Sequence, residues 1–179
     1  MARKANIVLA LSGRKRSGKT TAATRLVELA KEDGLQPMRM GFADPIKSEV
    51  AKIFGPYKEE DKAVIRPVYQ AVGEAMKTLK GKDTWIKRLD EAWEQLSGVG
   101  YNFLVIDDLR FPFEADWVRS MGGQIWKVLR DNSAPSDTHV SETSVKHVKP
   151  DWTILNSGTE DVFMARVTNT YEYTYRVDP

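Results

Sequence analysis

The feature that most constrains the fold is a glycine-rich segment that directly follows a short apolar run. Residues 6–11 are mostly apolar, as expected of a strand that is buried on both faces. Residues 13–20 then read GRKRSGKT and match the pattern G-x-x-x-x-G-K-[ST], in which backbone amides surround phosphate oxygens. From Lys19, apolar residues recur at helical spacing as far as Gly34. A strand, a phosphate-binding loop (P-loop) and a helix therefore open the chain.

The rest of the chain continues this alternation of strands and helices. Further strands are predicted at residues 37–42, 101–106, 124–129 and 152–155. Between and after them, helical patterns run over residues 44–55, from Pro67 as a first-turn residue, after Asp83 as a cap, over 114–120, and from Thr159. This order predicts a three-layer α/β/α fold, in which helices cover both faces of a parallel sheet of about five strands.

Residues 131–150 form a long polar segment with two prolines and no sustained periodicity. A structureless stretch of this length is typical of a functional loop, so we expect a lid-like loop here.

Composition excludes several classes of protein. The chain has 179 residues, enough for a single domain over residues 1–179, and it contains no cysteine and two histidines. Disulfide frameworks, thiolate zinc sites and cysteine nucleophiles are therefore excluded. The net charge of +2 is too small for a nucleic-acid coat. No apolar run approaches the roughly 18 residues of a membrane span, so we expect a soluble, cytoplasmic protein.

The P-loop pattern assigns chemistry to its residues. We expect Lys19 to reach the β- and γ-phosphates of a nucleotide and the Thr20 hydroxyl to contact magnesium. The remaining predicted ATP- and phosphate-binding residues are Gly13, Arg14, Lys15, Arg16, Ser17, Gly18 and Thr21. The three consecutive cations of the loop either form a solvated basic rim or contact phosphate.

Two adjacent acids, Asp107 and Asp108, follow the strand predicted at 101–106. An acid at this sheet edge is needed to hold magnesium or its water shell, and we assign Asp108 to that role. Neighbouring strand residues point to opposite faces, so one of the two faces the site, and Asp107 stays an alternative. A second alternative is that the acids merely cap the helix around Glu114.

Several short segments, in order and spacing, resemble the phage-type deoxynucleoside monophosphate kinases, which are P-loop proteins of the nucleoside monophosphate kinase fold. The likeness covers roughly residues 6–167. Besides the P-loop, the segments that resemble the family are FADPIK at 42–47, Gln70 with Gly73, DTWI at 83–86, DLRFPFEA at 108–115, HVSE at 139–142 and NSGT at 156–159. Two departures are Phe113, where the family usually has asparagine, and Lys77, where many relatives carry arginine.

The resemblance implies site residues for an acceptor nucleotide. It places acceptor binding in a helical region at about residues 43–98. The implied acceptor-binding residues are Asp44, Lys47, Gln70, Lys77, Trp85, Arg110, His139 and Glu142. The catalytic candidates are Lys19, Asp108, Arg110 and Arg130; the two arginines follow strand ends, where each either neutralises charge on the transferring phosphoryl group or forms a surface ion pair.

The implied activity is transfer of the γ-phosphoryl group from ATP, with Mg²⁺, to a deoxynucleoside monophosphate. The partners would be small nucleotides, with no membrane and no nucleic acid; relatives suggest a homodimer, in the host cytoplasm if the protein is phage-encoded. Two alternatives stay open: a P-loop kinase acting on a modified base or hydroxyl in DNA, and a nucleotide-dependent switch ATPase. Which bases are accepted, and whether ribose or deoxyribose is preferred, is not decided by these motifs.

Overall fold

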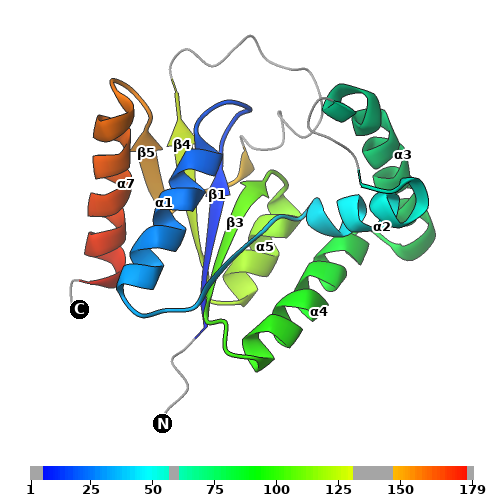
Figure 1. Cartoon of the computed structure of the whole chain (residues 1–179), viewed down its shortest axis with the longest axis horizontal. Coiled ribbons are helices and arrows are strands. Elements are labelled where there is room, and N and C mark those ends of the chain that lie inside the picture. The colour runs from blue at the N-terminus through cyan, green and yellow to red at the C-terminus, as the bar shows by residue number, and fades with distance from the viewer. Residues whose placement is uncertain (1–5, 57–60, 131–146, 177–179) are drawn as a thin grey trace.

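The computed structural model describes residues 6–56, 61–130 and 147–176. At its centre lies a parallel sheet of five strands in the order β2-β3-β1-β4-β5 (Figure 1). The strands span Ile7–Ser12 (β1), Pro37–Met40 (β2), Phe103–Leu109 (β3), Gln124–Leu129 (β4) and Trp152–Leu155 (β5). The predicted parallel sheet is confirmed, and the ranges predicted for β4 and β5 match the structure.

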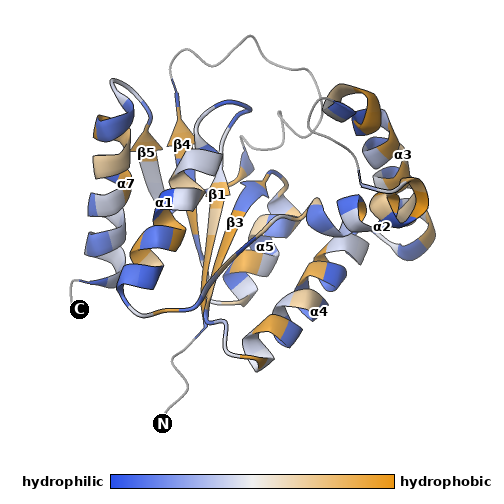
Figure 2. Ribbon diagram, in the orientation of Figure 1, coloured by the Kyte–Doolittle hydropathy of each residue, from blue (hydrophilic) through white to orange (hydrophobic). Residues whose placement is uncertain are grey.

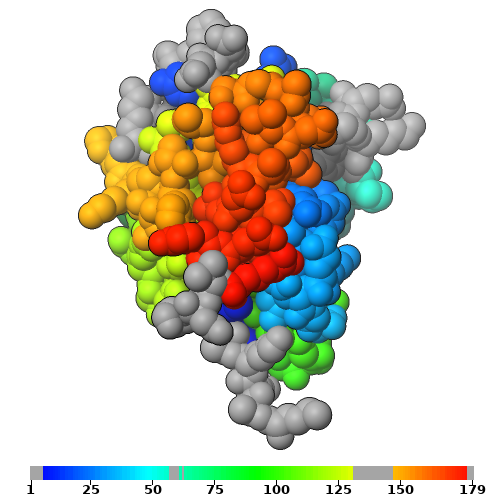
Figure 3. Space-filling model, turned by 90° about the vertical axis from the view of Figure 1, so that its left-hand side faces the viewer, coloured from blue at the N-terminus to red at the C-terminus, as the bar shows by residue number. Residues whose placement is uncertain are grey.

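Helices cover both faces of this sheet, as the alternating pattern predicts. The helices span Lys19–Glu32 (α1), Asp44–Phe54 (α2), Lys62–Lys80 (α3), Thr84–Gly98 (α4), Pro112–Ser120 (α5) and Glu160–Tyr175 (α7). Helices α1 and α7 cover one face, where Figure 3 shows α7 in red beside α1 in blue. Helices α4 and α5 cover the other face, and α2 and α3 stand beside the sheet (Figure 1).

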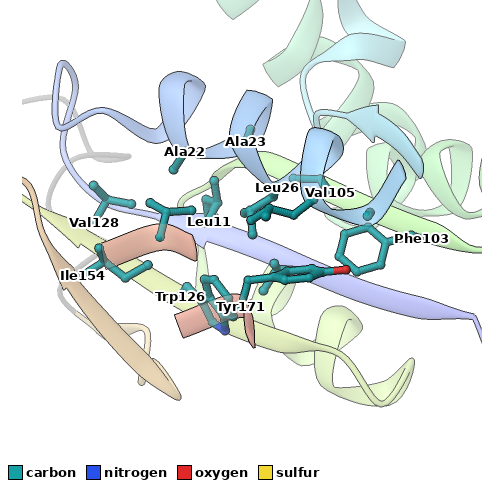
Figure 4. Close-up of a cluster of buried hydrophobic side chains, with 14 of the residues drawn as sticks. Leu11, Ala22, Ala23, Leu26, Phe103, Val105, Trp126, Val128, Ile154 and Tyr171 are labelled. Atoms are coloured by element: carbon teal, nitrogen blue, oxygen red, sulfur yellow. The ribbon is translucent and has the colours of Figure 1, made fainter. Parts of the chain in front are cut away.

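Two apolar clusters fill the spaces between the sheet and its helices. Leu9 and Leu11 of β1 belong to the cluster under α1 and α7 (Figure 4), whereas Val8 and Ala10 belong to the one under α4 and α5. Successive strand side chains point to opposite faces, so a strand covered on both sides is apolar throughout. Figure 2 shows β1 and its neighbours as the apolar centre of the molecule. Within the described residues, no helix is both long and apolar enough to cross a membrane.

Strands β2 and β3 end differently from the prediction. Strand β2 stops at Met40 rather than at residue 42, because the N–H groups that follow donate to carboxylates instead of to a neighbouring strand. Strand β3 starts at Phe103 and continues to Leu109, so both aspartates lie inside the strand and not after it. Its pairing with β1 shifts register between Ala10 and Ser12, where β3 accommodates an additional residue.

The expectation that Pro67 lies in the first turn of its helix is wrong. Helix α3 begins at Lys62, and Pro67 lies inside it. A proline there removes one main-chain hydrogen bond, the one to the carbonyl of Ala63. The surrounding residues are exposed to solvent, so water can hydrogen-bond to that carbonyl instead.

The predictions for the starts of α7, α4 and α5 are confirmed only in part. Thr159 caps α7 by accepting a 3.4 Å hydrogen bond from the Val162 N–H. Asp83 stands at the cap position of α4, but its side chain makes no cap bond and pairs with Lys87 at 2.7 Å. Helix α5 starts at Pro112, two residues before the predicted start.

Candidate active site

The glycines of the loop between β1 and α1 allow it to lie close to β4 and to the turn that follows β5. Gly13 and Gly18 have positive φ angles of 142° and 105°. A Cβ atom on Gly13 would lie 2.4 Å from the carbonyl oxygen of Val128, and one on Gly18 would lie 2.4 Å from the side-chain nitrogen of Asn156. Both positions therefore require glycine, for conformation and for space.

Lys19 lies against the main chain of this loop. Its Nζ donates to the carbonyl of Gly13 at 2.7 Å and to that of Arg14 at 2.8 Å. The first turn of α1 thereby brings the ammonium group to the loop, where it can neutralise charge on a phosphate that the loop amides bind.

The other predicted loop residues divide by exposure. The side chains of Arg14, Lys15, Arg16 and Thr20 are exposed, Thr21 is half-buried, and Ser17 is buried. The rim of the loop is therefore basic and open to solvent. Buried hydroxyls normally have hydrogen-bond partners, yet among the described residues the Ser12 and Ser17 hydroxyls have none. A phosphate oxygen or a water molecule at the loop would supply one, so the donor set fits an anionic ligand.

The two aspartates of β3 diverge. Asp107 pairs with Arg39 of β2, with a distance of 3.1 Å from Nε to Oδ2. Asp108 instead accepts from the main-chain N–H groups of Phe42, at 2.7 Å, and Ala43, at 3.0 Å. Burial raises the pKa of Asp108 above the usual range of a carboxyl group, although both hydrogen bonds oppose that rise. Neither aspartate caps α5.

Glu114 is a buried acid beside Asp108 that the sequence reasoning did not single out. Its Oε2 accepts from the N–H groups of Arg110, at 2.7 Å, and Phe111, at 2.9 Å, and so holds the start of α5. Burial raises its pKa to about 7, and the charge of Asp108 adds to the rise. The available signal was that Glu114 is the third residue of a helix that starts at Pro112, a position from which a glutamate side chain can accept from the main-chain N–H groups before the helix.

The acceptor candidates of α2 interact with each other at its start. Asp44 is the first residue of α2, and its Oδ2 accepts a 2.6 Å hydrogen bond from the N–H of Gly41. Its Oδ1 pairs with Lys47 Nζ at 2.6 Å. The structure therefore brings Asp44 and Lys47 together with the turn that Asp108 holds.

The acceptor candidates of α3 and α4 lie farther along this helical region. Lys77 pairs with Glu74 at 2.9 Å, and its Nζ lies 5.4 Å from the ring centre of Phe111. The Phe111 ring stacks on the ring of Phe113 with 5.2 Å between ring centres. Phe113, which stands where the family usually has asparagine, therefore supports the ring that Lys77 approaches. Gln70 is exposed on α3.

Trp85 serves to join two helices. Its ring is buried, and Nε1 donates a 3.2 Å hydrogen bond to the carbonyl of Gly73, which links α4 to α3. Arg88 lies over the ring at 5.9 Å and also pairs with Glu49 of α2. Trp85 thus contributes to the arrangement of the helical region around residues 43–98.

The remaining predicted residues lie at or beyond two strand ends. Arg110 follows β3 and is half-buried, and Arg130 follows β4 and is exposed. His139 and Glu142, with most of the predicted lid-like loop, lie outside the described residues. Within the described part of the chain, no three histidine or acidic side chains form a group that could hold a metal ion.

Comparison with known proteins identifies similar sequences. The family model described as deoxynucleotide monophosphate kinase matches residues 56–167. A putative deoxynucleotide monophosphate kinase of Acanthamoeba polyphaga mimivirus is 27% identical over 190 residues, covering 90% of this chain and 94% of that protein. The deoxynucleotide monophosphate kinase of Enterobacteria phage T4 is 26% identical over 112 residues, covering 62% of this chain and 46% of the phage protein. The match thus spans less than half of the phage relative.

Solved structures support the fold. Two structures of the APS kinase CysC of Mycobacterium tuberculosis, a Cys556Ala mutant and a complex with AMPPNP and APS, superpose with TM-scores of 0.50 and 0.52. In each case 94% of this chain and 98% of the other chain are covered, with 12% and 11% sequence identity. At such identity the likeness concerns the fold, which is that of a P-loop kinase.

Proposed function

Since this chain belongs to the deoxynucleotide monophosphate kinase family, we propose that it transfers the γ-phosphoryl group of ATP to a deoxynucleoside monophosphate, with release of ADP and the diphosphate. The observation that carries the proposal is the loop between β1 and α1. Its two glycines pack against β4 and the turn after β5, and Lys19 donates to its carbonyls. A P-loop of this kind positions a nucleoside triphosphate through its β- and γ-phosphates.

Phosphoryl transfer asks a protein mainly to position two anions and to neutralise charge. In this proposal the loop amides and Lys19 hold the triphosphate, and the exposed Arg14, Lys15 and Arg16 make its approach favourable. Arg110 and Arg130, at the ends of β3 and β4, neutralise charge on the transferring group.

Magnesium fits the residues at this edge of the sheet. Thr20 offers an exposed hydroxyl in the first turn of α1, and Asp107 and Asp108 offer carboxylates on β3. When bound, the ion would neutralise negative charge on the phosphate groups of the nucleotide. The residues proposed to hold it are Thr20 and one of the two aspartates.

The acceptor nucleotide is assigned to the helical region around residues 43–98. Asp44, Lys47, Gln70 and Lys77 are the polar side chains that this region offers, with Trp85 behind them as a packing residue. His139 and Glu142 stay predictions from the resemblance. We treat the whole chain as a single kinase domain, and its association into a homodimer is a further proposal that sedimentation analysis can test.

The decisive experiment mixes the purified protein with ATP and Mg²⁺ and with each deoxynucleoside or nucleoside monophosphate in turn. Formation of ADP and a nucleoside diphosphate in equal amounts, dependent on the acceptor, is the expected result. ATP hydrolysis that no acceptor stimulates would favour a switch ATPase, and phosphate transfer to DNA alone would favour a DNA-modifying kinase.

A further inference from the structure

The turn that leads into α2 is held by carboxylates of two elements. Three successive N–H groups, those of Gly41, Phe42 and Ala43, donate to acidic side chains, the first to Asp44 and the other two to Asp108. The first N–H groups of a helix and of the turn before it have no partner within the helix. Ala43 occupies the cap position and has no side-chain acceptor, and Asp108 of β3 accepts from the N–H groups of Ala43 and of Phe42 before it, so it fixes the turn that enters α2 rather than the first helical N–H groups.

Gly41 makes room for this arrangement. A Cβ atom at Gly41 would lie 2.7 Å from Oδ2 of Asp108 and 3.0 Å from its Cγ. The backbone of Gly41 is not in the left-handed region, so its conformation would accept other residues. The contact with the Asp108 carboxylate is therefore what excludes a side chain here.

Each oxygen of Asp108 already has a main-chain donor, whereas Asp107 faces a different part of the sheet. Alternation alone does not place Asp107, because Ile106 and Leu109 both belong to the cluster under α4 and α5 and the register with β1 shifts between them. Its partner Arg39 is opposite Val105, which belongs to the cluster under α1, whereas Met38 and Met40 on either side of Arg39 pack against the other cluster. Asp107 therefore lies on the sheet face that α1 covers, the helix that carries Thr20.

We propose that Asp108 is a positioning residue for the acceptor nucleotide: it fixes the N-terminal turn of α2, and with it Asp44 and Lys47, to the end of β3 beside the P-loop strand. The proposal rests on the proposed function, because it assigns the acceptor to α2. It leaves Asp107 as the acid that serves magnesium, in place of Asp108.

Two variants test this role by different physical routes. Asp108→Asn keeps the shape but turns one acceptor into a donor that faces an N–H group. Gly41→Ala keeps every charge and pushes the Asp108 carboxylate away from the turn. Both are expected to raise the KM for the deoxynucleoside monophosphate at least about tenfold, as for a lost charge-assisted hydrogen bond. The KM for ATP and the Mg²⁺ concentration for half-maximal rate should change less than about twofold, because the P-loop is untouched.

Amide hydrogen exchange gives a readout that does not depend on turnover. In both variants the amides of Phe42 and Ala43 should exchange faster, while those of the buried strand β1 keep their protection. Asp107→Asn is the matched control: it should raise the Mg²⁺ requirement, leave the acceptor KM unchanged and leave these two amides protected.

Opposite results would overturn the proposal. A raised Mg²⁺ requirement for Asp108→Asn with an unchanged acceptor KM would show that Asp108, and not Asp107, serves the metal. Wild-type acceptor KM in Gly41→Ala would separate the turn from acceptor binding, and it would do so even where Asp108→Asn does not fold. A wild-type protein that phosphorylates no monophosphate would instead refute the proposed function. The assay with each monophosphate in turn, made before any variant is tested, gives that result.

Discussion

The side-chain amide of Asn156 donates a 2.8 Å hydrogen bond to the main-chain carbonyl of Ser17. The bond joins the turn between β5 and α7 to the P-loop, although the two residues are far apart in sequence. The same amide nitrogen lies where a side chain on Gly18 would begin. Arg166 of α7 also holds this turn, because it donates to the carbonyl of Leu155 at 2.7 Å and to the hydroxyl of Ser157 at 2.9 Å. The position of the P-loop thus depends on a turn that contributes nothing to the glycine motif itself.

The first prediction concerns this bond. Asn156→Asp retains the size of the side chain but removes the donor, so we expect the KM for ATP to rise about fivefold, as for one hydrogen bond of about 1 kcal/mol. The acceptor KM should stay constant, because this turn follows β5 whereas α2 follows β2, and these two strands are the opposite edges of the sheet. Steady-state kinetics with each substrate varied in turn measures both. The control is Asn169→Asp, at an exposed position on α7. An equal rise in the KM for ATP in this variant would show that the added negative charge, and not the lost hydrogen bond, causes the effect.

The second prediction concerns Lys19. Lys19→Ala removes an ammonium group that lies against the P-loop carbonyls of Gly13 and Arg14. We expect kcat to fall at least about a hundredfold, since one preorganised charge contact supplies roughly 3 kcal/mol in the transition state. Circular dichroism should show an unchanged fold, because the side chain is only half-buried. A folded variant with near wild-type turnover would contradict the P-loop assignment.

The third prediction separates two threonines of α1. Thr20 and Thr24 are both exposed, but only Thr20 belongs to the P-loop pattern, and Thr24 donates to the carbonyl of Thr20 at 3.1 Å. Thr20→Ala should raise the Mg²⁺ concentration for half-maximal rate several-fold, because a hard cation loses an oxygen ligand. Thr20→Ser, which keeps the hydroxyl, should have the Mg²⁺ requirement of the wild-type protein, and so should Thr24→Ala. Equal Mg²⁺ dependence in all three variants would remove Thr20 from the metal site.

Local patterns predicted the P-loop and the last two strands well. The spacing of Gly13, Gly18 and Lys19 is a contiguous signal, and the apolar runs of β4 and β5 are bounded by glycine, arginine and asparagine. Such features depend on backbone geometry within a few neighbouring residues. They are therefore visible in a single sequence.

The difference between the partners of Asp107 and those of Asp108 could not be predicted in this way. It depends on the register shift between β1 and β3 and on the approach of Gly41 to the Asp108 carboxylate, two contacts between residues distant in sequence. The burial of Glu114 has a similar origin, because α5 folds back on the sheet beside Asp108. Tertiary packing, rather than local propensity, fixes the charge environment of the site.

The last prediction follows from Glu114. Burial raises its pKa from 4.5 to about 7, so the folded state favours the protonated carboxyl group relative to the unfolded chain. The stabilisation associated with Glu114 is therefore complete below pH 4.5, decreases as the pH rises toward 7, and stays constant above it. Glu114→Gln keeps an oxygen that can accept from the Arg110 and Phe111 N–H groups and cannot ionise. The free energy of unfolding of the variant, relative to wild type, should accordingly rise by on the order of 3 kcal/mol between pH 4.5 and pH 7. Urea unfolding of both proteins from pH 4.5 to pH 8 measures this difference, with Glu160→Gln, which removes an exposed carboxylate from the first turn of α7, as the control. A difference that does not change with pH would show that Glu114 ionises in the folded protein as it does in the unfolded chain.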